Sequence, residues 1–107
     1  MNPDREKHQV ALPNLRTIRR ACSKELYRTL KRLPSFIPAA AVREAEDLYT
    51  RRVVGHLEWI AAHRSNRKKL ADWWEEAVCS DIAALWQVDP AQLSRAFRDA
   101  FGGSHHR

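Results

Sequence analysis

Cationic side chains recur every three or four residues in the N-terminal third of this 107-residue chain. They are Arg16, Arg20, Lys24, Arg28, Lys31 and Arg32. On a helix this spacing places them along one face, and rows of guanidinium and ammonium groups bind phosphates or carboxylates. Residues 1–34 hold nine Lys and Arg against three Asp and Glu, whereas residues 35–107 hold ten of each. The net charge of +6 therefore belongs to the N-terminal third and predicts an anionic partner there.

A row of charges on a helix also has a simpler interpretation. Charged faces commonly serve only to keep a small helix solvated. The unequal distribution of charge along the chain favours a binding role, but the sequence alone leaves both interpretations open.

Catalytic and metal-binding patterns give no comparable signal. The sequence has no Gly-rich phosphate loop, no HExxH and no GxSxG motif. His56 and His63 lie seven residues apart on one predicted helix, which separates them by roughly 10 Å, too far to share a metal ion. Cys22 and Cys79 form no CxxC pair, and we expect both thiols to be unpaired and reduced. We therefore expect no enzymatic activity, no metal ion and no cofactor.

Helical periodicity predicts the elements that carry these side chains. Apolar residues recur at three and four throughout, and the prolines and the few glycines fall between the periodic stretches. The expected segments are a mobile arm (1–12), a basic amphipathic helix (13–33), a long helix (39–64), C-terminal helices (66–101) and a tail (102–107). We expect Phe36 and Ile37, between two prolines, to lie in the core. Whether the helix that begins near residue 66 breaks at Cys79-Ser80 stays open.

The predicted fold class is all-α, a small bundle of four or five helices forming a single domain over residues 1–107. The longest uncharged runs fall far short of the roughly twenty residues of a membrane-spanning helix, so we expect no membrane association. With no charged-then-apolar leader at the start of the sequence, we expect a cytoplasmic protein.

The most specific local pattern lies near the C-terminus. A helix-turn-helix needs a small residue where its helices touch, apolar residues beside the turn, a capping residue and an apolar anchor on the second helix. Here these positions are occupied by Ala83, Trp86, Val88, Asp89 and Leu93. The stretch resembles the helix-turn-helix of bacterial transcription regulators.

Over residues 81–102 the sequence is most similar to the arabinose-regulator (AraC) family. The similarity rests on the segment Gln92-Leu93-Ser94-Arg95-Ala96-Phe97 and on Phe101-Gly102 after it. Gln87 stands where these families usually place the glycine of the turn. An ordinary corner between two helices would show much of the same pattern.

The resemblance implies which side chains meet a ligand. It places Ala91, Gln92, Arg95 and Arg98 in the major groove of duplex DNA. In the function that we expect, the N-terminal cations or the mobile arm would contact phosphates. We therefore expect a small DNA-binding transcriptional regulator or accessory protein. Because small proteins of this kind usually bind two half-sites as dimers, we also expect a homodimer. The alternative is a protein-interaction module, an adaptor or inhibitor whose basic N-terminal helix binds an acidic protein. RNA binding through the same helix is a third interpretation.

Overall fold

The computed structural model describes residues 12–102, and every regular element in that part of the chain is a helix. The elements are α2 (Leu15–Leu30), α3 (Ala39–Gly55), α4 (Leu57–Ala62), α5 (Arg67–Trp74), the π-helical turn η1 (Glu75–Cys79), α6 (Ser80–Trp86) and α7 (Pro90–Phe101). This confirms the predicted all-α fold class. The predicted arm and tail fall almost entirely on residues 1–11 and 103–107, outside the described residues.

The helix starts follow the sequence signals. The side chain of Asn14 accepts a hydrogen bond from the Thr17 amide at 2.9 Å, and Asn66 accepts one from the Lys69 amide at 3.0 Å. Asp89 does the same for Gln92 at 3.0 Å. Each cap satisfies an amide in the first turn that has no partner within its helix.

The prediction of one continuous helix over residues 39–64 is wrong. The helix ends at Gly55, and His56, with φ −129°, separates α3 from α4. Glycine is a poor residue for a helix interior because its backbone loses the most freedom there, so the break falls at the weakest point.

The open question at Cys79-Ser80 is resolved in favour of continuity. Trp74, Glu75, Cys79 and Ser80 all keep right-handed helical backbone angles, so α5, η1 and α6 form one helical segment. A π-helical turn accommodates one extra residue without ending the helix.

We expected Phe36 to lie in the core, but it does not. Its side chain is 87% exposed, whereas Ile37 is buried. Ile37 precedes Pro38, which favours extended backbone, and consecutive side chains of extended backbone point to opposite sides. Burying Ile37 therefore turns Phe36 outward.

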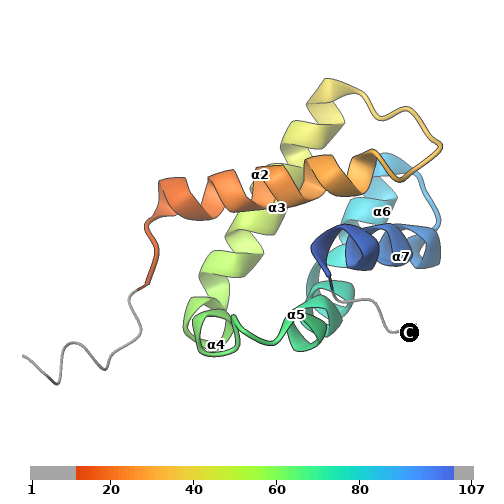
Figure 1. The fold of residues 1–107 in the computed structure, drawn as a ribbon. Coiled ribbons are helices and arrows are strands. Elements are labelled where there is room, and N and C mark those ends of the chain that lie inside the picture. The colour runs from red at the N-terminus through yellow and green to blue at the C-terminus, as the bar shows by residue number, and fades with distance from the viewer. Residues whose placement is uncertain (1–11, 103–107) are drawn as a thin grey trace, which may run out of the picture.

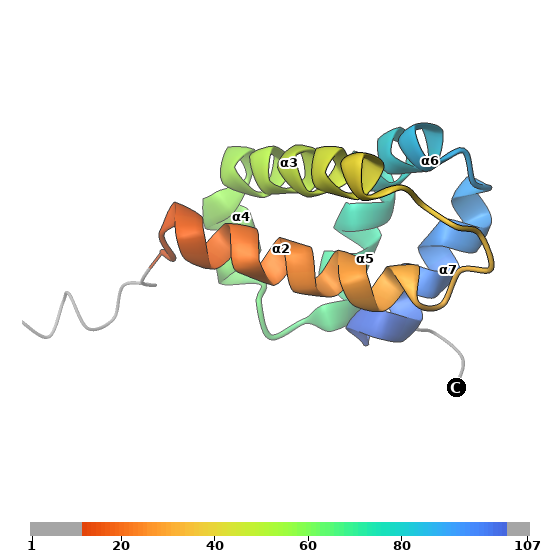
Figure 2. The ribbon, with the colours of Figure 1, turned by 90° about the horizontal axis from the view of Figure 1, so that it is seen from above.

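The core joins the middle of the chain to its C-terminal helix. The rings of Trp74 and Phe97 stack with centroids 3.8 Å apart, and Tyr49 meets both rings edge-on. α2 packs against α3 and α7 through a buried stripe that includes Ile18, Cys22 and Leu26, hence it covers this core from one side (Figures 1 and 2). No helix within residues 12–102 is both long and apolar enough to cross a bilayer.

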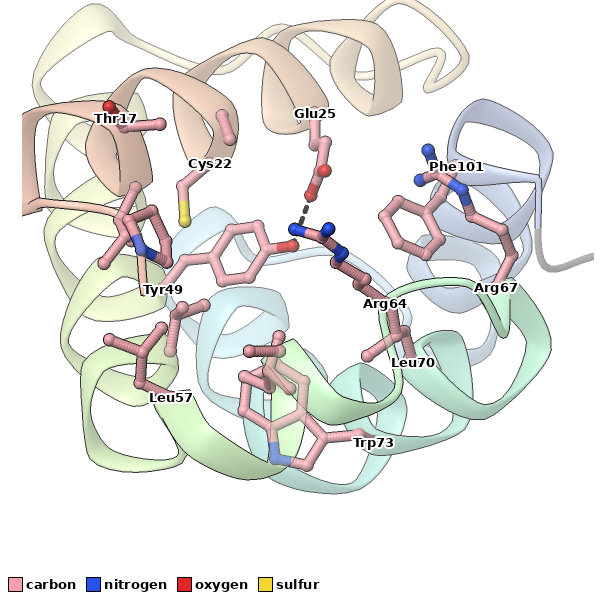
Figure 3. A pocket seen from close by; sticks show the side chains of 16 residues that line it. Thr17, Cys22, Glu25, Tyr49, Leu57, Arg64, Arg67, Leu70, Trp73 and Phe101 are labelled. Atoms are coloured by element: carbon pink, nitrogen blue, oxygen red, sulfur yellow. Dashed lines mark hydrogen bonds between the residues drawn. The ribbon is translucent and has the colours of Figure 1, made fainter. Parts of the chain in front are cut away.

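A cavity of about 270 Å³ lies on the inner side of α2 (Figure 3). Its walls come from α2, α3, α4, α5 and the end of α7. Arg16, Arg20 and Lys24 line a different groove, between α2 and α3, and none of them lines this cavity.

The thiols of Cys22 and Cys79 are unpaired and buried, as predicted. Burial raises the pKa of Cys22 to about 12 and that of Cys79 to about 11.

Because the thiolate is the reactive form, we expect a disulfide reagent at pH 8 to modify both thiols about a hundredfold or more slowly in the folded than in the unfolded protein. Thiol titration checks this. Rapid modification of the folded protein, or fewer than two thiols after unfolding without reductant, would contradict it.

Candidate nucleic-acid interface

The outward side of α2 and of the turn after it carries the predicted cations. All six are exposed: Arg16, Arg20, Lys24, Arg28, Lys31 and Arg32. We call this set the cationic face. The opposite side of α2 holds the buried stripe, so the fold fixes which way the cationic face points.

The cationic face forms no ion pair among the described residues, although the charge of Arg28 acts on the Glu25 carboxyl. The ion pairs in that part of the chain use Arg19, Arg52, Lys68 and Arg98 instead. Arg19, at the edge of the face, pairs with Asp47 at 2.5 Å. The positive charges of the six remaining residues are therefore left for solvent or for a ligand.

Helix stability accounts for only part of the cationic face. Arg28 lies in the last turn of α2, Lys31 is its C-cap residue, and Arg32 Nη1 donates a hydrogen bond to the Arg28 carbonyl at 2.9 Å. A helix macrodipole favours anions at the start and cations at the end, so Arg16 near the start is placed unfavourably. Neighbouring like charges along one face also repel each other. An anionic ligand would relieve both effects.

Tyr27 is an aromatic residue of this surface that the sequence analysis did not single out. Tyr27 is 57% exposed, and Lys31 Nζ lies 4.7 Å from the centre of its ring. It borders a shallow groove between α2 and α3, where Val42 provides an apolar wall. Its spacing from Lys24 and Lys31, three residues before and four after, was a signal available in the sequence.

The residues that carry the helix-turn-helix resemblance form two helices joined by a three-residue turn, residues 87–89. Ala83 and Trp86 are buried, and Leu93 is fully buried on the second helix. Gln87 has φ 55° and ψ 48°, the left-handed conformation for which glycine is preferred. The Val88 amide donates to the Ala83 carbonyl at 3.0 Å and closes the turn. The turn thus keeps its left-handed residue even though Gln87 stands where glycine is usual.

The exposed side of α7 is less cationic than the resemblance implies. Ala91 and Arg95 are exposed and Gln92 is half-buried. The carboxylates of Asp89 and Asp99 are exposed near them. Among these residues Arg95 is the single cation, and it lies between two acids along the helix.

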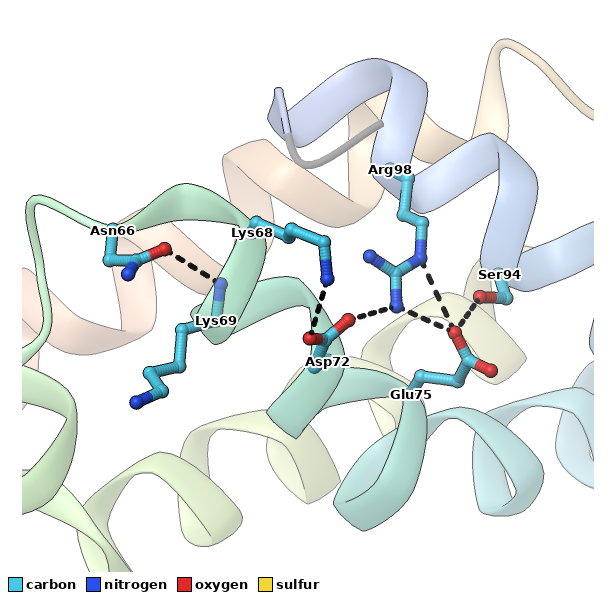
Figure 4. Close-up of polar contacts among 7 residues, drawn as sticks. All are labelled: Asn66, Lys68, Lys69, Asp72, Glu75, Ser94 and Arg98. Atoms are coloured by element: carbon cyan, nitrogen blue, oxygen red, sulfur yellow. Dashed lines mark hydrogen bonds and ion pairs between the residues drawn. The ribbon is translucent and has the colours of Figure 1, made fainter. Parts of the chain in front are cut away.

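Arg98 is not available as a groove contact, which corrects one of the predicted site residues. Its side chain is 9% exposed, and its Nη2 atom lies 2.7 Å from Asp72 Oδ1 and 2.8 Å from Glu75 Oε1 (Figure 4). Ser94 donates a further hydrogen bond to Glu75 at 2.8 Å. The Arg98 guanidinium holds the pKa of Asp72 and Glu75 below their usual values. Arg98 therefore fixes α7 against α5 and η1.

The structure thus gathers the exposed cations on α2, whereas the exposed side of α7 carries both acidic and basic residues. Within residues 12–102 no group of three His, Cys, Asp or Glu side chains is placed to hold a metal ion. What the described surface offers chemically is a row of charge-assisted hydrogen-bond donors suited to phosphates or carboxylates.

No protein-family model matches the chain, and comparisons with curated proteins and with solved structures likewise found no significant match.

Proposed function

We propose that this protein is a small DNA-binding regulator or accessory protein that holds duplex DNA mainly through the cationic face of α2. The observation that carries the proposal is the row of six exposed Arg and Lys side chains, which form no ion pair in the described part of the chain. Replacing condensed counterions on DNA by such side chains is the dominant source of sequence-independent affinity.

In this proposal the α6–α7 unit supplies a limited sequence preference. Its left-handed turn and buried Leu93 support a helix-turn-helix arrangement, in which Ala91, Gln92 and Arg95 face base edges. Because Asp89 and Asp99 are exposed on the same helix, α7 adds little electrostatic affinity. We propose a homodimer that places two such units on successive half-sites.

The experiment measures binding to a fluorescent duplex by anisotropy over a range of salt concentrations. It compares Lys24→Gln on the cationic face with the matched change Lys69→Gln on α5, where Lys69 is also exposed. Loss of one phosphate contact reduces the slope of log K against log salt by about 0.9. We expect this change for Lys24→Gln and none for Lys69→Gln.

A third variant, Arg95→Ala, tests the base-reading role. It is expected to cost about 1–3 kcal/mol on a preferred site selected from random duplexes, and much less on random DNA. Absence of salt-dependent duplex binding by the unmodified protein would overturn the proposal, as would equal slopes for the two lysine variants. Binding of an acidic protein in place of DNA, lost in Lys24→Gln, would establish the interaction-module alternative.

A further inference from the structure

The cavity behind α2 has one apolar wall and one polar wall. Leu57, Leu70 and Trp73 form much of the apolar side (Figure 3), together with Ile60. The cavity is partly open to solvent, with the exposed Arg64 and Arg67 among its lining residues. Pockets for small molecules commonly combine an apolar lining with a few convergent polar groups.

The polar side is built around a carboxyl group. The Tyr49 hydroxyl donates a hydrogen bond to Glu25 Oε1 (Figure 3). Burial raises the pKa of Glu25, while its hydrogen bond with Tyr49 and the charge of Arg67 act in the opposite direction. Arg67 is held over the Phe101 ring, with its guanidinium carbon 4.4 Å from the ring centre.

Neither guanidinium group is held in a close ion pair, although the charge of Arg67 acts on the Glu25 carboxyl. None of the ion pairs in the described part of the chain includes Arg64 or Arg67. Two cations therefore face a cavity that contains one carboxyl group, one oxygen of which is already hydrogen-bonded to Tyr49. This balance of charge favours an anionic head group over a cationic one.

The size of the cavity limits the rest of the ligand. An apolar cavity of about 150 Å³ is enough to hold benzene. The cavity here, about 270 Å³, has room for one ring or a short branched chain together with a small polar group.

We propose that this cavity binds a small amphipathic monocarboxylate. Its carboxylate pairs with Arg64 and Arg67, and its ring-sized apolar body packs against Leu57, Ile60 and Trp73. The site uses the inner side of α2, so the proposal does not depend on DNA binding by the cationic face.

The test uses three probes that share a phenyl ring and differ in charge: phenylacetate, 2-phenylethanol and phenethylamine. Binding to the full chain is measured by isothermal calorimetry and by NMR shifts of the Trp73 indole and the Ile60 methyl groups. We expect phenylacetate to bind about tenfold or more tightly than the neutral alcohol, because its head group forms charge-assisted hydrogen bonds, and phenethylamine to bind most weakly.

Variants assign the roles of the two walls. Arg64→Gln and Arg67→Gln should each weaken phenylacetate binding several-fold and leave 2-phenylethanol binding unchanged, while Arg51→Gln, at an exposed position outside the cavity lining, should change neither. Ile60→Trp fills the cavity and should abolish binding of all three probes. Both arginines are exposed, so their variants are expected to fold normally.

Three results would overturn the proposal: preferential binding of phenethylamine, no binding of any probe, or phenylacetate binding that Arg64→Gln and Arg67→Gln do not weaken. Each is distinguishable from failure of the DNA-binding proposal, because the cavity experiment contains no nucleic acid.

Discussion

Phe97→Ala is expected to destabilise the fold by about 3–5 kcal/mol, the usual cost of removing a buried aromatic ring. Phe97 is 1% exposed and stacks on both Trp74 and Phe101, with ring centroids 3.8 Å and 5.0 Å away. The change leaves a cavity where α5 and α7 meet. Domains of this size are commonly stable by only about 5–15 kcal/mol, so the loss is a large part of the total.

Chemical denaturation followed by circular dichroism measures this effect, and Phe36→Ala is the matched control. Phe36 undergoes the same chemical change at an 87% exposed position, where the expected effect on the free energy of unfolding is within about 0.5 kcal/mol. Similar losses of stability in the two variants would contradict the placement of these rings.

Arg98→Met is the second large effect that we expect. The change removes the guanidinium that Asp72 and Glu75 share while keeping most of the apolar stem. Both carboxylates are about half exposed, so the expected loss, about 1–3 kcal/mol, lies between the values for exposed and for buried ion pairs. Arg95→Met, one turn earlier on α7 at an exposed position, should cost much less.

The pH dependence of stability separates this ion-pair effect from a packing effect. Arg98 holds the pKa of Asp72 and Glu75 below their usual values in the folded protein. A carboxyl with a lowered folded pKa stabilises the fold above its ordinary pKa, and that stability is lost as the pH falls through the lowered value. The difference between the unmodified protein and Arg98→Met should therefore be largest near neutral pH and shrink in acid. A difference that is constant from pH 7 to pH 3 would exclude the ion-pair explanation.

Local sequence signals were sufficient to predict the helical class, most helix starts and the direction of the cationic face. Asn14, Asn66 and Asp89 cap helices because a side-chain oxygen reaches an amide three residues later, which needs no tertiary contact. The cationic face is equally local. Once Ile18, Cys22 and Leu26 turn inward, the helical repeat sends Arg16, Arg20 and Lys24 outward.

Local sequence signals could not predict features that depend on segments far apart in the chain. Arg95 and Arg98 are the same residue type on one helix, yet Arg95 is exposed and Arg98 is buried, because Asp72 and Glu75, 26 and 23 residues away, lie under Arg98. Phe36 is exposed because its neighbour Ile37 occupies the core instead. The cavity exists only because five helices surround it without filling it.

The sequence by itself therefore determined helix type, helix caps and charge distribution, all of which arise from interactions within one or two helical turns. The tertiary structure decided which polar groups are partnered and where a small ligand has room to bind. These depend on how helices pack side by side, and packing brings together residues whose separation along the chain carries no local signal.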